Sequence, residues 1–389
     1  MSYWKDFFGK SASLVEDKWD ELRFNLKNKL RLNDPIQIVP YRTYGTARRV
    51  YIKGRVLEDK RIATAGDKDT ILNNLLNMYK RFESDEVPQA QLKVFLADEE
   101  HVVSTDKEGY FVIALNPNTP IINEQLWHPI PLHLINAPIP YKEGLHIQAE
   151  VMIPPPDAEY GIISDIDDTI VKTSATNLLA MSRITFLNNA RTRLPFAGVA
   201  EFYKALQLGR NGKRNNPFFY VSSSPWNLYD LLKEFLDLNN IPAGPLLLRD
   251  FGFEHKKNTK GGHMGHKFKE IEQILNTYPQ LQFVLVGDSG QEDPAIYREV
   301  VTQFPGRILA IYIRDVNLPD RKKIAIDVSQ SLKQDKTEML IVENTVQAAE
   351  HAAQIGLIFT ETIPIIEQDK KEDKGQVPGK EDTTIINPS

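Results

Sequence analysis

The sequence contains no cysteine among its 389 residues, which excludes disulfide frameworks, thiolate zinc sites and a cysteine nucleophile. It also lacks an apolar run of the roughly 18–20 residues that span a bilayer. Its opening residues, MSYWKDFFGK, do not show the charged start and apolar segment of a signal peptide. These absences predict a cytoplasmic protein.

Basic residues are not in excess. There are 47 Lys and Arg against 52 Asp and Glu, for a formal net charge of −5. A protein that coats nucleic acid normally carries a basic surplus, so we expect no nucleic-acid partner. Apolar residues make up 41% and charged residues 25%, as in ordinary globular proteins. At roughly 150 residues per domain, the length predicts two or three domains.

Residues 1–34 carry a helical pattern. Between Trp4 and Leu30 apolar residues recur at steps of three and four, and Pro35 follows, where helices commonly end. The pattern predicts an amphipathic helix with two interpretations. The helix packs on its own domain, or it lies in a membrane interface, because aromatic residues gather at one end and lysines flank the apolar stripe.

Residues 35–156 are mostly β in pattern. Short β-rich runs are RRVYIKGRVLED, QLKVFLAD, YFVIALN, PLHLIN and HIQAEVMI, with one helix expected at about 69–82. STDKEGYF supplies a turn, which resembles that of small transthyretin-like sandwich domains. The prolines at 154–156 end the domain, since proline cannot continue a ladder. We predict a smaller, β-sandwich-like domain with no recognisable chemistry and an unknown protein partner.

The pattern changes after Tyr160. Buried-looking strands (GIIS, FFYVS, LLLR, FVLVG, LAIYI, MLIVE) alternate with amphipathic helices, the last of them from about Thr345 to Gln354. This alternation predicts an α/β domain with a mainly parallel sheet over residues 157–366. Beyond about Glu367 no apolar periodicity remains, which predicts a disordered tail over 367–389.

Polar residues follow the predicted strands, and ligands of open α/β sheets bind beyond the carboxyl ends of the strands. The groups concerned are Asp165-Ile166-Asp167-Asp168-Thr169, Ser222-Ser223-Ser224, a helix start near His266-Lys267, and Asp288 to Asp293 in GDSGQED. If the strands are neighbours, these groups share one pocket. Clustered acids without paired histidine or cysteine favour a hard cation, here Mg²⁺.

Such a pocket suits phosphoryl transfer. A strand-end carboxylate attacks phosphorus and forms an aspartyl-phosphate. A second carboxylate two residues on points the same way, because side chains alternate along an extended chain, and it exchanges protons with the leaving group and with water. A lysine and a serine hydroxyl hold the non-bridging oxygens.

This ordered set resembles the haloacid dehalogenase superfamily of phosphatases, whose pattern is DxDxT, a strand-end Ser or Thr, a Lys, and GDxxxxD. The resemblance covers about residues 157–365 and implies a Rossmann-like domain. It implies that Asp165 is the nucleophile and a metal ligand, and that Asp167 is the general acid/base and gives the metal its backbone carbonyl. It assigns phosphate binding to Ser222 and Lys267, with Lys269 as the competing lysine, and metal binding to Asp288 and Asp293.

The residues that flank these motifs resemble one family within this superfamily. SDIDDTIVKT, VSSSPWNLY, LLLRDFG and LVGDSGQEDPAIY resemble the actin-patch type phosphatidate phosphatases and their bacterial relatives. That resemblance implies a magnesium-dependent hydrolase of lipid metabolism that converts phosphatidate to diacylglycerol. Residues 170–216 and 225–266 leave no room for a sizeable cap, which agrees with a substrate held in a membrane.

Membrane contact has two candidate segments, residues 1–32 and the basic segment 254–269, EHKKNTKGGHMGHKFK. The lysines of this basic segment either attract anionic lipid headgroups, which would place the protein at the membrane periphery, or belong to a solvated loop. Two other functions stay open: a phosphatase acting on a soluble ester or a phosphoprotein, and a non-catalytic binding or scaffold protein.

Overall fold

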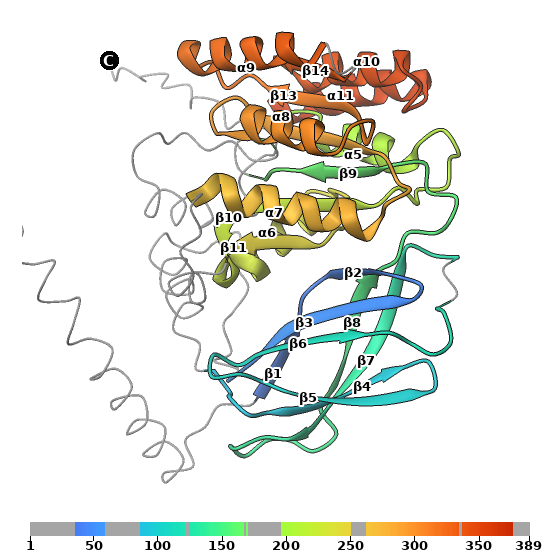
Figure 1. Ribbon diagram of the computed structural model, residues 1–389, viewed down its shortest axis with the longest axis vertical. Helices are drawn as coiled ribbons and strands as arrows, with labels where there is room; N and C mark the ends of the chain where they lie inside the picture. The colour runs from blue at the N-terminus through green and yellow to red at the C-terminus, as the bar shows by residue number, and fades with distance from the viewer. Residues whose placement is uncertain are drawn as a thin grey trace, which may run out of the picture.

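The computed structural model describes residues 36–58, 86–121, 124–166, 169, 196–249, 262–333 and 337–375. They form a β domain and an α/β domain, which lie one below the other in Figure 1. The predicted helices at 1–34 and 69–82 lie outside the described residues.

Eight strands build the β domain, and they include every predicted run of residues 35–156. They are β1 (Ile36–Pro40), β2 (Thr43–Thr46), β3 (Arg49–Glu58), β4 (Gln91–Leu96), β5 (Glu99–Ser104), β6 (Tyr110–Leu115), β7 (Trp127–Asn136) and β8 (His146–Met152). Their order is β1-β3-β2-β8-β7-β4-β5, with β6 on β3. The pairs are antiparallel except for β2 and β8, which are parallel. Apolar side chains from both ends of this sheet, such as Ile52 of β3 and Leu92 of β4, share one core.

The predicted turn TDKEGYF joins the two ends of the sheet. Asp106 Oδ1 accepts hydrogen bonds from the backbone N–H of Glu108 and of Tyr110, and Gly109 takes a φ of 73°. The strands on either side of it do not pair with each other, since β5 pairs with β4 and β6 with β3. The turn therefore carries the chain across the domain.

The α/β domain alternates strands and helices, as predicted. Its strands are β9 (Gly161–Ser164), β10 (Phe218–Pro225), β11 (Leu246–Arg249), β12 (Phe283–Asp288), β13 (Ile308–Arg314) and β14 (Glu338–Val342). Its helices are α5 (Val199–Leu208), η1 (Trp226–Leu228), α6 (Tyr229–Leu238), α7 (Gly262–Thr277), α8 (Asp293–Gln303), α9 (Pro319–Leu332), α10 (Thr345–Gln354), η4 (Thr360–Thr362) and α11 (Ile363–Gly375).

All six strands of this sheet are parallel, in the order β11-β10-β9-β12-β13-β14. The chain therefore builds outward from β9 first on one side and then on the other. This is a doubly wound sheet, and the ligand crevice of such a sheet lies at the carboxyl ends of its central strands, where the direction changes. Asp165 follows β9, directly at that point.

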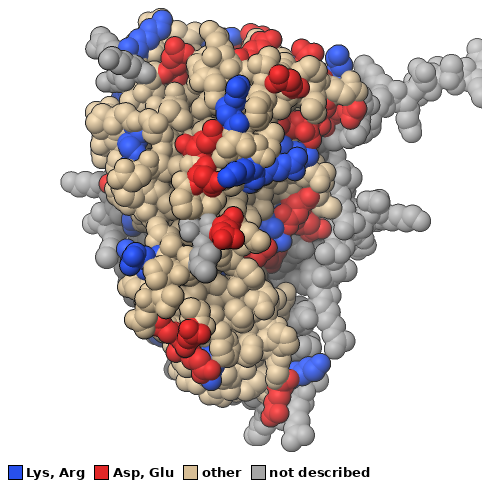
Figure 2. Space-filling view, turned by 90° about the vertical axis from the view of Figure 1, so that its right-hand side faces the viewer, with Lys and Arg blue, Asp and Glu red and all other residues tan. Residues whose placement is uncertain are grey.

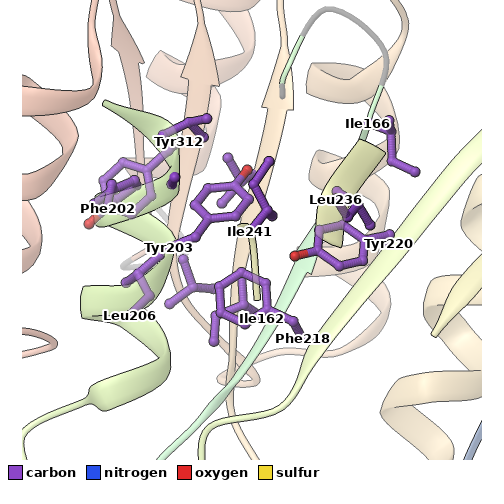
Figure 3. Close-up of a cluster of buried hydrophobic side chains, with 14 of the residues drawn as sticks. Ile162, Ile166, Phe202, Tyr203, Leu206, Phe218, Tyr220, Leu236, Ile241 and Tyr312 are labelled. Atoms are coloured by element: carbon purple, nitrogen blue, oxygen red, sulfur yellow. The ribbon is translucent and has the colours of Figure 1, made fainter. Parts of the chain in front are cut away.

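Helices cover both faces of the sheet, which explains why its strands are continuous apolar runs. Buried side chains of α5, α6, α10 and α11 pack on one face, and those of α7, α8 and α9 pack on the other. On the first face the rings of Tyr203 and Phe218 lie 5.1 Å apart, and they stand together over β9 with Ile162 in Figure 3. The sheet is thus a rigid base for the residues at its edge.

The predicted disordered tail over 367–389 is wrong at its start, because helix α11 spans residues 363–375. The rest of that predicted tail, residues 376–389, lies outside the described part. Ile366 is fully buried, and Asp373 Oδ2 accepts a hydrogen bond of 2.7 Å from the backbone N–H of Gly198, at the start of α5. Lys370 donates to the Asn344 side chain at 3.0 Å. These contacts join segments far apart in the chain, so local periodicity does not indicate them.

The two domains share buried side chains. Tyr41 of the β domain belongs to one apolar core of the α/β domain, and Met152 belongs to the other. Tyr278 of the segment after α7 donates a hydrogen bond of 2.9 Å to the backbone carbonyl of Gly45. The β domain is therefore packed firmly against the α/β domain.

Acidic and basic side chains lie side by side on the face that Figure 2 shows, without a broad area of one sign. Across the described ranges, none of the helices has the length and apolar character that crossing a bilayer requires.

Candidate active site

Asp165 stands at the centre of the site. The strand before it, GIIS, is buried along its whole length between β10 and β12. The backbone N–H of Asp165 donates to the carbonyl of Val286 at 2.9 Å, which continues the ladder to β12, and the residue is 1% exposed. The carboxylate is therefore held at the carboxyl edge of the sheet by its own backbone.

Asp288 and Asp293 lie beside it. Asp288 ends β12, and its Oδ1 accepts from the backbone N–H groups of Gly290 at 2.6 Å and Gln291 at 2.9 Å. Asp293 begins α8, and its Oδ2 accepts from the backbone N–H of Asp288 at 3.2 Å. A Cβ at Gly287 would stand 2.6 Å from that oxygen, so this turn requires glycine. Backbone donors thus fix both carboxylates.

Three carboxylates meet as predicted. Oxygen atoms of Asp165, Asp288 and Asp293 all lie within 4.8 Å of one another, and all three residues are buried. Buried carboxylates at this spacing repel one another unless a cation lies among them. An all-oxygen donor set is the kind that Mg²⁺ prefers, so the residues present fit this ion.

Lys267, and not Lys269, joins the three acids. Its Nζ lies 2.7 Å from Asp293 Oδ1 and 3.0 Å from Asp165 Oδ1, whereas Lys269 is exposed. Burial lowers the pKa of Lys267, but Asp165, Asp293 and Asp288 outweigh this effect and raise it above its ordinary value. The ammonium group therefore stays charged at neutral pH and offsets part of the negative charge.

The helix that carries Lys267 begins earlier than predicted. Helix α7 starts at Gly262 rather than near His266, so residues 262–269 of the basic segment 254–269 are helical and not a loop. Residues 254–261 lie outside the described part. The two glycines at 261 and 262 weaken the helical signal in the sequence, because glycine has a low helix propensity.

Ser222 lies on β10, the other neighbour of β9. The strand does not end at Val221 but runs to Pro225, with a shift in its pairing to β11 between Val221 and Pro225. Tyr220 pairs with Ser164, so Ser222 stands at the same sheet edge as Asp165. It is fully buried, and its Oγ accepts from the backbone N–H of Ser224 at 3.0 Å.

Gln291 was not among the predicted site residues. Its Nε2 lies 3.4 Å from Asp165 Oδ2, and its Oε1 lies 3.4 Å from Lys267 Nζ. The only sequence signal for it is its place inside GDSGQED, between two predicted metal ligands. Asp167 lies outside the described residues, and Thr169, which ends the first motif, is 3% exposed.

Comparison with known proteins covers this part of the chain. Residues 160–315 match the family described as the catalytic domain of phosphatidate phosphatase APP1. Phosphatidate phosphatase APP1 of Saccharomyces cerevisiae is 37% identical over 155 residues, which are 40% of this chain and 25% of that protein. An uncharacterized protein of Schizosaccharomyces pombe is 31% identical over 157 residues, with the same shares. The chain thus spans about a quarter of the length of these curated relatives.

Solved structures are less similar. A carbohydrate acetylesterase from Xanthomonas citri is 10% identical, with a TM-score of 0.24, and the match covers 75% of this chain and 72% of that chain. A TM-score of this size carries no argument about fold or function. The sequence matches fall on the domain that holds the three carboxylates and Lys267: residues 160–315 are similar to the family of phosphatidate phosphatase APP1 catalytic domains.

Proposed function

We propose that the protein is a magnesium-dependent phosphatidate phosphatase that hydrolyses the phosphate monoester of phosphatidate to diacylglycerol. The observation that carries this proposal is the group of three buried carboxylates and one buried lysine at the carboxyl edge of the parallel sheet. The sequence match to the APP1 catalytic domain supports phosphatidate as the substrate. The motif order and the doubly wound sheet support membership of the haloacid dehalogenase superfamily.

Asp165, Asp288 and Asp293 would hold the metal, together with the backbone carbonyl of Asp167. Bound Mg²⁺ would reduce the repulsion between an anionic phosphate and the carboxylates and would orient both. The spacing of the three carboxylates, within 4.8 Å, supports this assignment.

The residues of the chain carry the chemistry itself. An oxygen of Asp165 attacks phosphorus, the bond to the lipid oxygen breaks, and an aspartyl-phosphate forms. Asp167 gives a proton to the leaving alkoxide and then takes one from the water that hydrolyses the aspartyl-phosphate. Lys267 and Ser222 hold the non-bridging oxygens, where negative charge accumulates in the transition state. Gln291, within 3.4 Å of Asp165, orients the nucleophile.

A lipid substrate implies that the protein works at the membrane periphery in the cytoplasm. Only three short elements, η1, α6 and β11, lie between Pro225 and Arg249, so no cap domain is inserted there in the described part. A site without a cap would admit a headgroup that stays in the bilayer plane. The segments 1–32 and 254–269 remain the candidates for membrane contact, and residues 1–32 and 254–261 lie outside the described part.

A substrate panel tests the proposal. Purified protein is assayed for phosphate release from phosphatidate in mixed micelles, from soluble phosphate esters and from a phosphoprotein, each with Mg²⁺ and with EDTA. We expect release from phosphatidate only with Mg²⁺. Faster turnover of a soluble ester or a phosphoprotein would replace the lipid substrate, and no release from any of them would favour a non-catalytic binding protein.

A further inference from the structure

The end of β10 connects the predicted phosphate site to the β domain. Ser222, Ser223 and Ser224 are all at most 2% exposed, and the regular pairing of β10 with β11 is interrupted over this stretch. Backbone that leaves a ladder needs other contacts to hold its position. Trp226 of η1 follows Pro225, the last residue of β10, and packs against the β domain.

Trp226 is held between side chains of the β domain and α6. Tyr41 stacks on it with ring centroids 4.7 Å apart and an interplanar angle of 19°. The Nζ of Lys53, on β3, lies 3.9 Å from the centre of the indole ring, which is within the range of a cation–π contact. Tyr229 of α6 stacks at 6.1 Å. Two of the three partners thus come from the other domain.

The backbone of the β domain keeps these two side chains together. The N–H of Tyr41 donates to the carbonyl of Lys53 at 2.9 Å, and the N–H of Arg42 donates to the hydroxyl of Tyr229 at 2.6 Å. Lys53 also lies 5.5 Å from the ring of Tyr110, another buried residue of the same domain. The Tyr41–Lys53 pair is therefore a fixed part of the sheet and not a mobile surface contact.

Lys53 acts on the helix of Lys267 as well. Glu270, one turn after Lys267 on α7, lies 3.9 Å from His266, on the same helix. Burial raises the pKa of Glu270, and the charges of Lys269 and Lys53 oppose that rise. The charge of Lys53 is thus felt on α7, the helix of Lys267, while its ammonium group contacts Trp226.

We propose that Tyr41 and Lys53 are positioning residues, which hold Trp226 and through it the end of β10, with Ser222, in the geometry that binds phosphate. The inference rests on the proposed function and gives the β domain a role in it. The β domain is then a structural part of the phosphate site and not an independent binding module.

Full-length variants test this with inorganic phosphate as the probe, so that no turnover is required. Phosphate affinity in MgCl₂ is measured by calorimetry for wild type, Lys53→Met, Lys53→Arg and Tyr41→Leu, and kcat and KM for micellar phosphatidate are measured alongside. Lys53→Met should weaken phosphate binding roughly tenfold, the size of a strong cation–π contact, and Lys53→Arg should restore it. Tyr41→Leu should change the affinity in the same direction.

Lys93→Met is the matched control. Lys93 also lies over an aromatic ring, Phe95 at 5.9 Å, and pairs with Glu100, but on β4 near the other end of the sheet. This variant should bind phosphate as wild type does. Thermal unfolding of each variant identifies a loss of phosphate affinity that comes from misfolding. Wild-type affinity in Lys53→Arg would show that the charge at this position is what matters.

The outcomes separate the two proposals. If the wild type binds phosphate and Lys53→Met binds it equally well, the positioning role is wrong. If the wild type hydrolyses no phosphomonoester while Lys53→Met still weakens phosphate binding, the phosphatase proposal fails and the positioning role stands. A wild type that binds no phosphate in Mg²⁺ overturns the inference, because the end of β10 with Ser222 would then not be a phosphate site.

Discussion

Lys267 brings a positive charge into a group of three buried carboxylates. Its removal leaves the carboxylates with less compensation and, in the proposed mechanism, takes away one contact to the transferring phosphate. We predict that Lys267→Met lowers kcat about 100- to 1,000-fold, the loss typical of one removed transition-state donor. It should also lower Tm, and added Mg²⁺ should recover more Tm in the variant than in the wild type.

Lys269→Met is the control for this experiment, because Lys269 is an exposed residue of the same helix. It should keep wild-type kcat and wild-type Tm. Equal kcat in Lys267→Met and the wild type would contradict the assignment of Lys267 to the site.

Arg314 ends β13 and lines a cavity with Thr169 and Tyr203. Its guanidinium carbon lies 3.0 Å from the centre of the Phe196 ring, and the described residues place no carboxylate within 4.0 Å of it. Burial lowers the pKa of Arg314 to about 9, so its surroundings disfavour the charge. We predict that Arg314→Met raises Tm by about 2–4 °C, because the cost of burying this charge exceeds the contact to Phe196 that the described residues give it.

Arg55→Met gives the opposite sign as a comparison. Arg55 is buried and Arg314 half-buried, but Arg55 donates to Glu86 at 2.7 Å and to the backbone carbonyl of Glu108 at 2.8 Å. Its loss should lower Tm. Differential scanning calorimetry measures both variants, and a lower Tm for Arg314→Met would refute the account of Arg314.

Among the elements, α6 is linked across the domain boundary to Arg42, the residue before β2, by a charged pair. Arg42 Nη1 lies 2.9 Å from Asp237 Oδ1, and Lys233 of the same helix lies 2.8 Å from Asp237 Oδ2. Burial raises the pKa of Asp237, but hydrogen bonds from Lys233 and Arg42 lower it by more, so it lies below the ordinary value. The folded state therefore favours the charged carboxylate.

This shift predicts a pH dependence with a definite sign. A carboxyl whose folded pKa is lowered contributes stability above its unfolded pKa, about 4, and loses that contribution as pH falls through the folded value. Asp237→Asn should therefore lower the free energy of unfolding at pH 7 by about 0.5–1 kcal/mol, after discounting for the partly exposed carboxylate. The difference from wild type should shrink as pH falls below 4.

Denaturant unfolding between pH 3 and pH 7 measures the Asp237 effect. The control is Asp327→Asn, which changes an exposed acid on α9. That variant should follow the wild type at every pH. A stability difference for Asp237→Asn that stays constant across the range would contradict the role given to its charge.

For the whole molecule, the sequence predicts whatever depends on neighbouring residues. Continuous apolar runs such as FVLVG indicate strands buried on both faces, and all six predicted strands of the parallel sheet are present. The acids that follow two of these runs, Asp165 and Asp288, lie together because neighbouring parallel strands end at one edge. This convergence depends on the order of the strands, which the sequence does not reveal. The prediction of one shared pocket therefore held only if the strands were neighbours.

Contacts between distant segments were beyond the reach of the sequence. Helix α11 depends on hydrogen bonds from Asp373 to the start of α5, and the extension of β10 to Pro225 is accompanied by packing of Trp226 against Tyr41. Gln291 joins the site through Asp165, 126 positions earlier in the chain. Each of these is a tertiary contact that overrides a local pattern, so periodicity and spacing could not indicate it.

The packing of Trp226 against Tyr41 also changes the picture of the whole molecule. The sequence predicts a β domain without chemistry, and the structure packs it against Trp226, which follows the strand that carries Ser222. The two domains therefore share buried aromatic and charged contacts beside the candidate active site. We expect them to unfold in a single transition, with coincident curves from tryptophan fluorescence and circular dichroism.

The central claim is that Asp165 is the nucleophile of a metal-dependent phosphatase. Phosphate release from phosphatidate micelles in Mg²⁺ is measured for wild type and for Asp165→Asn, and Tm is measured to check that the variant is folded. Asparagine is chosen because the amide keeps the shape of the side chain but cannot form the aspartyl-phosphate. The account predicts at least about a 1,000-fold loss of kcat in the variant. Turnover by Asp165→Asn at the rate of the wild type would contradict it.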